Sequence, residues 1–134
     1  MAKEYKIFIS HSWQYSDTLE ALRDLINARG YFSATYEEST RDNPINSENE
    51  SYVKFRLTKK IGDSDIILAL AGVYASHSSW MAWELDKALE LGIPIVGVIP
   101  RGQERISKVV SSRSIVDVRW NTESIIAAIR ANAK

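Results

Sequence analysis

The chain has 134 residues, 45% of them apolar and 25% charged, which is the balance of one ordinary folded domain. It has no cysteine, which excludes disulfides, thiolate metal sites and a cysteine nucleophile, and its 17 basic residues balance 17 acidic ones, which gives no electrostatic attraction to nucleic acid or an anionic membrane. The first residues lack the apolar stretch of a signal peptide and no run of about 18 apolar residues occurs, so we expect a single cytoplasmic domain over residues 1–134 that binds neither nucleic acid nor membrane.

Short apolar or β-branched runs alternate with segments of helical period along the chain. The expected elements, in chain order, are strand Tyr5–Ser10, helix Asp17–Arg29, strand Tyr31–Tyr36, helix Glu50–Ile61, strand Asp65–Leu70, helix Ser79–Leu91, strand Ile93–Ile99, helix Gln103–Val110, strand Ser114–Val118 and helix Thr122–Ala131. The third and fourth strands are almost continuously apolar, which is typical of strands covered on both faces. The second strand is more polar and is expected at an edge. The length of the polar loop Glu37–Asn49 indicates a functional or mobile loop.

This alternation predicts an α/β fold with a parallel sheet and helices on both faces. Right-handed crossovers and short loops leave few topologies for five strands, and the common one is the flavodoxin-like, doubly wound order 2-1-3-4-5. In that order a ligand crevice lies between strands 1 and 3, at their carboxyl ends. The segments Ser10–Tyr15 and Ala71–Trp80 are therefore the places to look for a site.

Glu84 stands out on the third predicted helix. On a helical wheel of about 100° per residue, it falls inside the arc of apolar side chains, whereas Trp83 falls among the charged ones. A carboxylate on an apolar face costs free energy unless it is paired or lies at an opening, and such a group suits proton transfer or a developing positive charge. Alternatively, Glu84 is a structural acid that pairs with a basic side chain or caps a backbone group.

The segment after the first strand, Ser10–Ser16, combines hydroxyls, an imidazole and aromatic rings. At a topological switch point these groups suit the ribose, phosphate and base of a nucleotide, although a polar turn that caps the next helix has the same composition. The segment lacks the glycines of a G-x-G-x-x-G or Walker A loop. A zinc site would need both histidines, His11 and His77, together with carboxylates, and we expect no metal.

Several segments, in order and spacing, resemble Toll/interleukin-1 receptor (TIR) domains. Ile7–Ser12 resembles the family's VFISHS first strand. Its third and fourth strands are resembled by Ser64–Leu70 and Ile93–Val96, and Tyr74–Leu85 carries its tyrosine, tryptophan and glutamate signature. Met81 stands where the signature usually has cysteine. The similarity covers roughly Tyr5 to Ile99 and is greatest to the compact TIR-like proteins of bacteria and archaea, which include those of Thoeris-type antiphage defence.

The resemblance implies an enzyme that cleaves NAD+ between nicotinamide and ribose, and that hydrolyses or cyclises the ADP-ribose part into a signal. The family's catalytic glutamate lies four residues after the signature tryptophan, and that position is Glu84. The expected substrate contacts are Ser10, His11, Ser12, Trp13 and Trp80. NAD+ would be a substrate, with no further cofactor. Self-association through TIR surfaces and a downstream effector that senses the product are also implied.

Two other functions fit the sequence. A non-enzymatic TIR-like interaction module would use Glu84 structurally and present Trp83 at an interface. A nucleoside deoxyribosyltransferase-like enzyme would use a carboxylate as nucleophile, and the segments Ala82–Leu85 and Leu91–Pro94 partly resemble that family.

Overall fold

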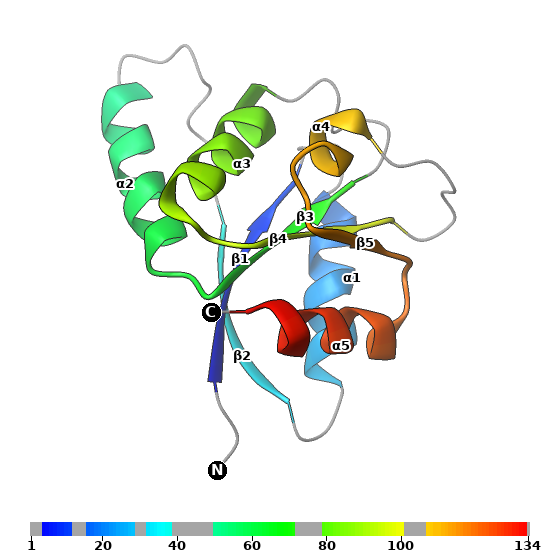
Figure 1. The fold of residues 1–134 in the computed structure, drawn as a ribbon. Coiled ribbons are helices and arrows are strands. Elements are labelled where there is room, and N and C mark those ends of the chain that lie inside the picture. The colour runs from blue at the N-terminus through cyan, green and yellow to red at the C-terminus, as the bar shows by residue number, and fades with distance from the viewer. Residues whose placement is uncertain are drawn as a thin grey trace.

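Strands and helices alternate along the computed structural model (Figure 1), which describes residues 4–11, 16–28, 32–38, 50–71, 79–100 and 107–133. The strands are β1 (Glu4–Ser10), β2 (Ser33–Glu38), β3 (Ile66–Leu70), β4 (Ile95–Val98) and β5 (Val116–Val118). The helices are α1 (Ser16–Asn27), α2 (Glu50–Gly62), α3 (Ser79–Leu91), α4 (Lys108–Ser111) and α5 (Thr122–Asn132).

The strands form one parallel sheet in the order β2-β1-β3-β4-β5, so the predicted fold class and strand order are confirmed. The more polar β2 lies at an edge, as expected. It begins at Ser33 rather than Tyr31, because its ladder with β1 starts where Ser33 pairs with Glu4. Phe32, just before the ladder, stacks on the ring of Tyr5 with centroids 5.2 Å apart.

Helices cover both faces of the sheet (Figure 1). One face packs with α1 and α5 and the other with α2, α3 and α4, since each face has its own cluster of buried apolar side chains. Alternation along β1 explains the division, because Ile7 and Ile9 belong to the first cluster and Phe8 to the second. Each of four helices buries an apolar stripe, whose members are Leu19, Leu22, Ile26, Leu57, Ile61, Met81, Leu85, Ala88, Ile125, Ile126 and Ile129.

The helix predicted over Gln103–Val110 is wrong in its bounds. Ser107 is extended, with φ −66° and ψ 136°, so no continuous helix runs through it, and α4 begins at Lys108. The Ser107 hydroxyl accepts a hydrogen bond from the backbone N–H of Val109 at 3.2 Å, as an N-cap does. The predicted start at Gln103 lies outside the described residues, and the Ser107 cap sets where the observed helix begins.

Tyr36 of β2 gives the fold a pH dependence. Its phenol is partly buried and donates a hydrogen bond to Asn27 Oδ1 at 3.1 Å. Burial raises the pKa of Tyr36 from 10.0 to about 12, against an opposing effect of the Arg23 charge. The native state therefore holds this proton more tightly than the unfolded chain, and the stabilisation is complete below pH 10.0 and lost as the pH rises toward about 12.

Chemical denaturation of the wild type and of Tyr36→Phe at several pH values checks this expectation. Between pH 10.0 and about 12, the free energy of unfolding should fall more steeply in the wild type, since the other tyrosines are common to both proteins. Parallel pH profiles would contradict it.

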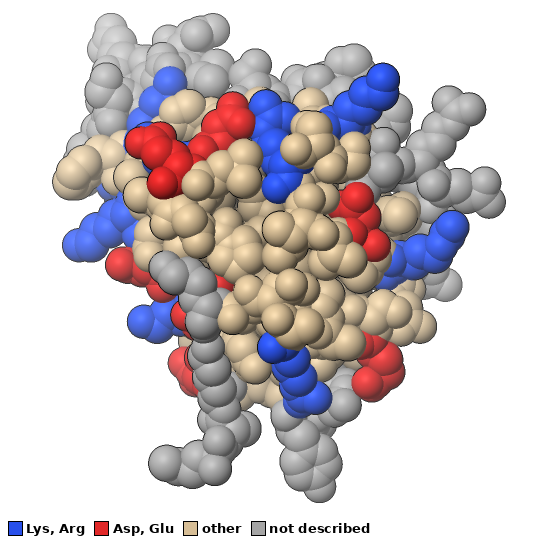
Figure 2. Space-filling model, in the orientation of Figure 1, with Lys and Arg blue, Asp and Glu red and all other residues tan. Residues whose placement is uncertain are grey.

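Figure 2 shows side chains of both charge signs around an uncharged central area of the face seen in Figure 1. Exposed apolar side chains in this part of the fold include Leu89, Ile115 and Val116, near the end of α3 and the start of β5. No helix in the described ranges is long and apolar enough to cross a membrane.

Candidate active site

Ser10 and Glu84 meet where β1 ends. The Ser10 hydroxyl donates a hydrogen bond of 2.8 Å to Glu84 Oε1, between residues 74 positions apart in sequence. Both are buried, with exposed fractions of 0% and 1%. The helical wheel's placement of Glu84 on the inward side of its helix is therefore confirmed, and the carboxylate does not project into solvent.

Periodicity in both elements brings these side chains together. Ser10 and Phe8 are two residues apart on β1, so they project to the same face, which α3 covers. On α3, Met81, Glu84, Leu85 and Ala88 form one buried stripe. Glu84 is the acid within this otherwise apolar stripe.

The pair lies at the carboxyl ends of the neighbouring strands β1 and β3. Ser10 is the last residue of β1 and pairs with Ala69, next to the end of β3. His11 follows and is also buried, with 4% exposed. This is the edge where parallel α/β sheets bind ligands when the strand order reverses, as it does here between β1 and β3.

A carboxylate buried in this way needs a polar partner, because moving a charge out of water is costly. The Ser10 hydroxyl supplies one, and a hydrogen bond donated to a carboxylate stabilises its charged form and fixes its rotamer. A leucine at position 84 would pack on the apolar neighbours without that cost. A buried acid at a sheet's ligand-binding edge is characteristic of catalytic and binding sites.

The other predicted contacts are only partly placed. Ser10 contacts Glu84 at the end of β1, and the buried His11 is the next residue along the chain. Ser12, Trp13 and the side chain of Trp80 lie outside the described residues, as does most of the Glu37–Asn49 loop. Substrate contact by these residues stays a prediction. Among the described residues, no three His, Asp or Glu side chains gather as metal ligands would.

Trp83, which the wheel placed among charged residues, is partly buried between α2 and α3. Its ring packs against the buried cluster on this face, with Lys54 Nζ 5.5 Å and Lys87 Nζ 5.7 Å from the ring centroid. The contact with Lys54 joins α2 to α3, whereas Lys87 lies on the same helix as Trp83. The Lys54 contact could not be predicted from the sequence, because it depends on the pairing of α2 with α3.

Several solved structures share the fold at low sequence identity. A 2-deoxyribosyltransferase from Bacillus psychrosaccharolyticus has a TM-score of 0.63 at 18% identity, over 90% of this chain and 89% of its own. The CMP N-glycosidase BcmB of Clostridium botulinum has a TM-score of 0.55 at 13% identity, over 93% and 98%. A flavoprotein from Lactobacillus acidophilus NCFM, solved with FMN, has a TM-score of 0.50 at 10% identity, over 94% and 98%. No curated protein matches the sequence.

Fold and site together define a flavodoxin-like α/β protein with a buried carboxylate where its strand order reverses. The family model of the TIR-like domain of the Thoeris protein ThsB matches residues 8–105. The chain therefore belongs to this family, and with it to the TIR-family defence proteins, which confirms the resemblance found in its sequence.

Proposed function

We propose that this protein cleaves NAD+ at the bond between nicotinamide and ribose, with Glu84 as the catalytic carboxylate. The observation that carries the proposal is the buried hydrogen bond between Ser10 and Glu84 at the carboxyl ends of β1 and β3. Membership of the TIR-like family adds support, since the matched residues 8–105 include Glu84, where the sequence resemblance puts the family's catalytic glutamate.

For this reaction the protein must hold the dinucleotide and stabilise the charge that develops on it. The N-glycosidic bond breaks, its electron pair passes to the pyridinium nitrogen, and nicotinamide leaves as a neutral molecule. Positive charge then develops on the ribose, and a fixed carboxylate beside it lowers the barrier. Water attacks the ribose C1 and releases a proton to give ADP-ribose, or an atom of the same molecule attacks instead and closes a ring. Glu84 stabilises the charge, and Ser10 keeps its carboxylate in place.

Two of the structures that share the fold are named for related bonds. One is a 2-deoxyribosyltransferase and the other a CMP N-glycosidase, so this architecture can house chemistry at a nucleoside's glycosidic bond. Likeness at this identity speaks for the fold alone. A deoxyribosyltransferase-like reaction is the second candidate function, and in it Glu84 would act as a nucleophile rather than as a stabilising charge.

One incubation separates the candidates. Protein at high concentration is mixed with NAD+ in one arm, and with a deoxynucleoside and a free base in the other. Release of nicotinamide, with ADP-ribose or its cyclised form identified by mass, supports NAD+ cleavage. Exchange of bases in the second arm alone favours the transferase, and no turnover in either arm, with a crowding agent present, favours a non-enzymatic interaction module.

Within this proposal, the product is the signal of a defence pathway. Its ADP-ribose part would be read by a separate effector, and self-association of TIR surfaces would assemble the active form. Both steps follow from the family resemblance. The dependence of NAD+ cleavage on protein concentration tests self-association directly.

Ser10→Ala tests the positioning of the carboxylate. Loss of a hydrogen bond to a buried charged group should lower kcat by about tenfold or more, with KM nearly unchanged, because the serine holds Glu84 rather than the dinucleotide. Ser64→Ala is the matched control, since Ser64 is also buried but donates its hydroxyl to the Lys60 carbonyl. A raised KM at constant kcat would instead make Ser10 a substrate contact.

A further inference from the structure

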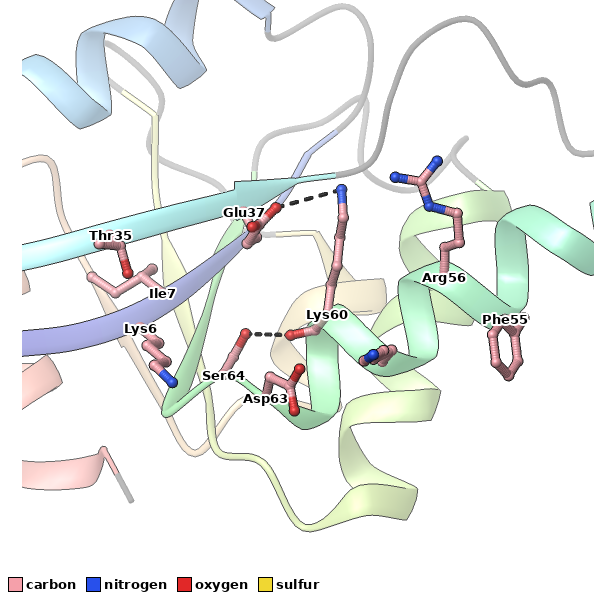
Figure 3. Close-up of a pocket in the computed structure, with 10 residues that line it drawn as sticks. Lys6, Ile7, Thr35, Glu37, Phe55, Arg56, Lys60, Asp63 and Ser64 are labelled. Carbon is pink, nitrogen blue, oxygen red and sulfur yellow. Dashed lines mark hydrogen bonds and ion pairs between the residues drawn. The ribbon is translucent and has the colours of Figure 1, made fainter.

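A hollow lies between the edge strand β2 and helix α2, away from Ser10 and Glu84 (Figure 3). Its volume is about 550 Å³, within the range of small-molecule sites. Lys6 of β1 lies at one end of it, four residues before Ser10, a separation of roughly 13 Å along a strand. The two sites are therefore distinct places on the same sheet face.

The hollow exists because α2 does not cover β2. Helix α2 buries Leu57 and Ile61 against the centre of the sheet. On β2, Ala34 and Tyr36 pack against the opposite face, which leaves the polar Thr35 exposed toward α2. A polar strand face thus stays open beside a charged helix face.

Basic side chains outnumber acidic ones around this hollow, in a chain whose overall charge is zero. The basic residues are Lys6, Arg56, Lys59 and Lys60, and the acidic ones are Glu37 and Asp63. Glu37 is already engaged by Lys60, with Oε2 and Nζ 3.4 Å apart (Figure 3). Lys6 of β1 and Lys59 of α2 add basic charge to the hollow from two different elements, as expected of a site for an anion.

We propose that this hollow binds the phosphate group of a small organic phosphate. Lys6 and Lys59 supply the charge from opposite sides, and the Thr35 hydroxyl on β2 supplies a neutral donor. Phe55, which is 69% exposed, borders the hollow on α2, at the end away from Lys6 and Thr35 (Figure 3), where the organic part of the ligand would lie. Asp63 opposes the anion and limits its affinity.

Amide chemical shifts of the full chain, titrated with pyrophosphate, AMP or adenosine, test the proposal. Pyrophosphate and AMP should shift the amides of Lys6, Thr35 and Lys59 saturably at millimolar concentrations, on the order of the weakest specific ligands, and adenosine should not. Lys6→Gln and Lys59→Gln should each weaken binding about three- to fivefold, and Asp63→Asn should tighten it about twofold. Lys108→Gln, a change to an exposed lysine of α4, is the matched control and should bind as the wild type does.

Three outcomes would overturn the proposal. One is the absence of any saturable shift, and another is unchanged affinity in both lysine variants. The third is a set of shifts centred on Ser10 and Glu84, which would place the phosphate at the candidate active site. None of these readings depends on NAD+ cleavage, so the proposal stands or falls separately from the function proposed above.

Discussion

Glu84→Gln is expected to lower NAD+ cleavage by on the order of 10²–10³-fold while the fold stays intact. The amide has nearly the shape of the carboxylate and can still accept a hydrogen bond from the Ser10 hydroxyl, so packing around the buried site is kept. What is lost is the negative charge that opposes the developing oxocarbenium ion. Initial rates of nicotinamide release measure the effect, and thermal unfolding checks the fold.

Glu90→Gln is the matched control for this prediction. Glu90 lies on the same helix but is exposed and pairs with Lys87, with Nζ and Oε2 3.0 Å apart. Its loss should leave the rate unchanged and alter stability by less than about 1 kcal/mol, as for other exposed ion pairs. If both variants cleave NAD+ at the wild-type rate, Glu84 is a structural acid and the catalytic assignment fails.

Gly97→Ala is expected to destabilise the fold by about 1–3 kcal/mol, or roughly 5–15 °C in Tm. Gly97 of β4 pairs with Asp117 on β5, and a Cβ there would overlap the Asp117 carboxylate and lie 3.0 Å from Val110 Cγ1. The carboxylate is also held in place, because it accepts a hydrogen bond from the Ser114 hydroxyl. Relief of the overlap therefore requires several side chains to move.

Gly62→Ala serves as the control for the strand glycine. A Cβ at Gly62, the last residue of α2, would meet only Leu91 Cδ1, at an ordinary 3.6 Å. Alanine is the better helix former, so this variant should be neutral or more stable by up to about 1 kcal/mol. Adding Asp117→Ala to Gly97→Ala should recover part of the lost stability. Equal Tm values for the two single variants would show that the overlap is relieved at little cost.

Much of the fold followed from periodicity in the sequence. The continuous apolar runs of β3 and β4 mark central strands, and the polar β2 marks an edge. The inward position of Glu84 could be predicted because a helical wheel needs no tertiary information. Bounds were less predictable, since the start of β2 depends on its pairing with Glu4 and the start of α4 on the Ser107 cap.

The partner of Glu84 could not be predicted from the sequence. Ser10 was expected to contact a substrate, which stays a prediction. That its hydroxyl also donates to the Glu84 carboxylate depends on which face of β1 meets α3. The hollow beside β2 was also missed. Its signal is the basic series along α2, in which Arg56, Lys59 and Lys60 share a helix face, but only the sheet order places that face beside an open strand.

The most direct measurement is a crystal structure of Glu84→Gln with NAD+ bound. We predict the ribose of the nicotinamide half against the side chain of residue 84, at the carboxyl ends of β1 and β3, with the Ser10 hydroxyl still bonded to that side chain. A dinucleotide bound with this ribose away from residue 84 would contradict the proposed catalytic role.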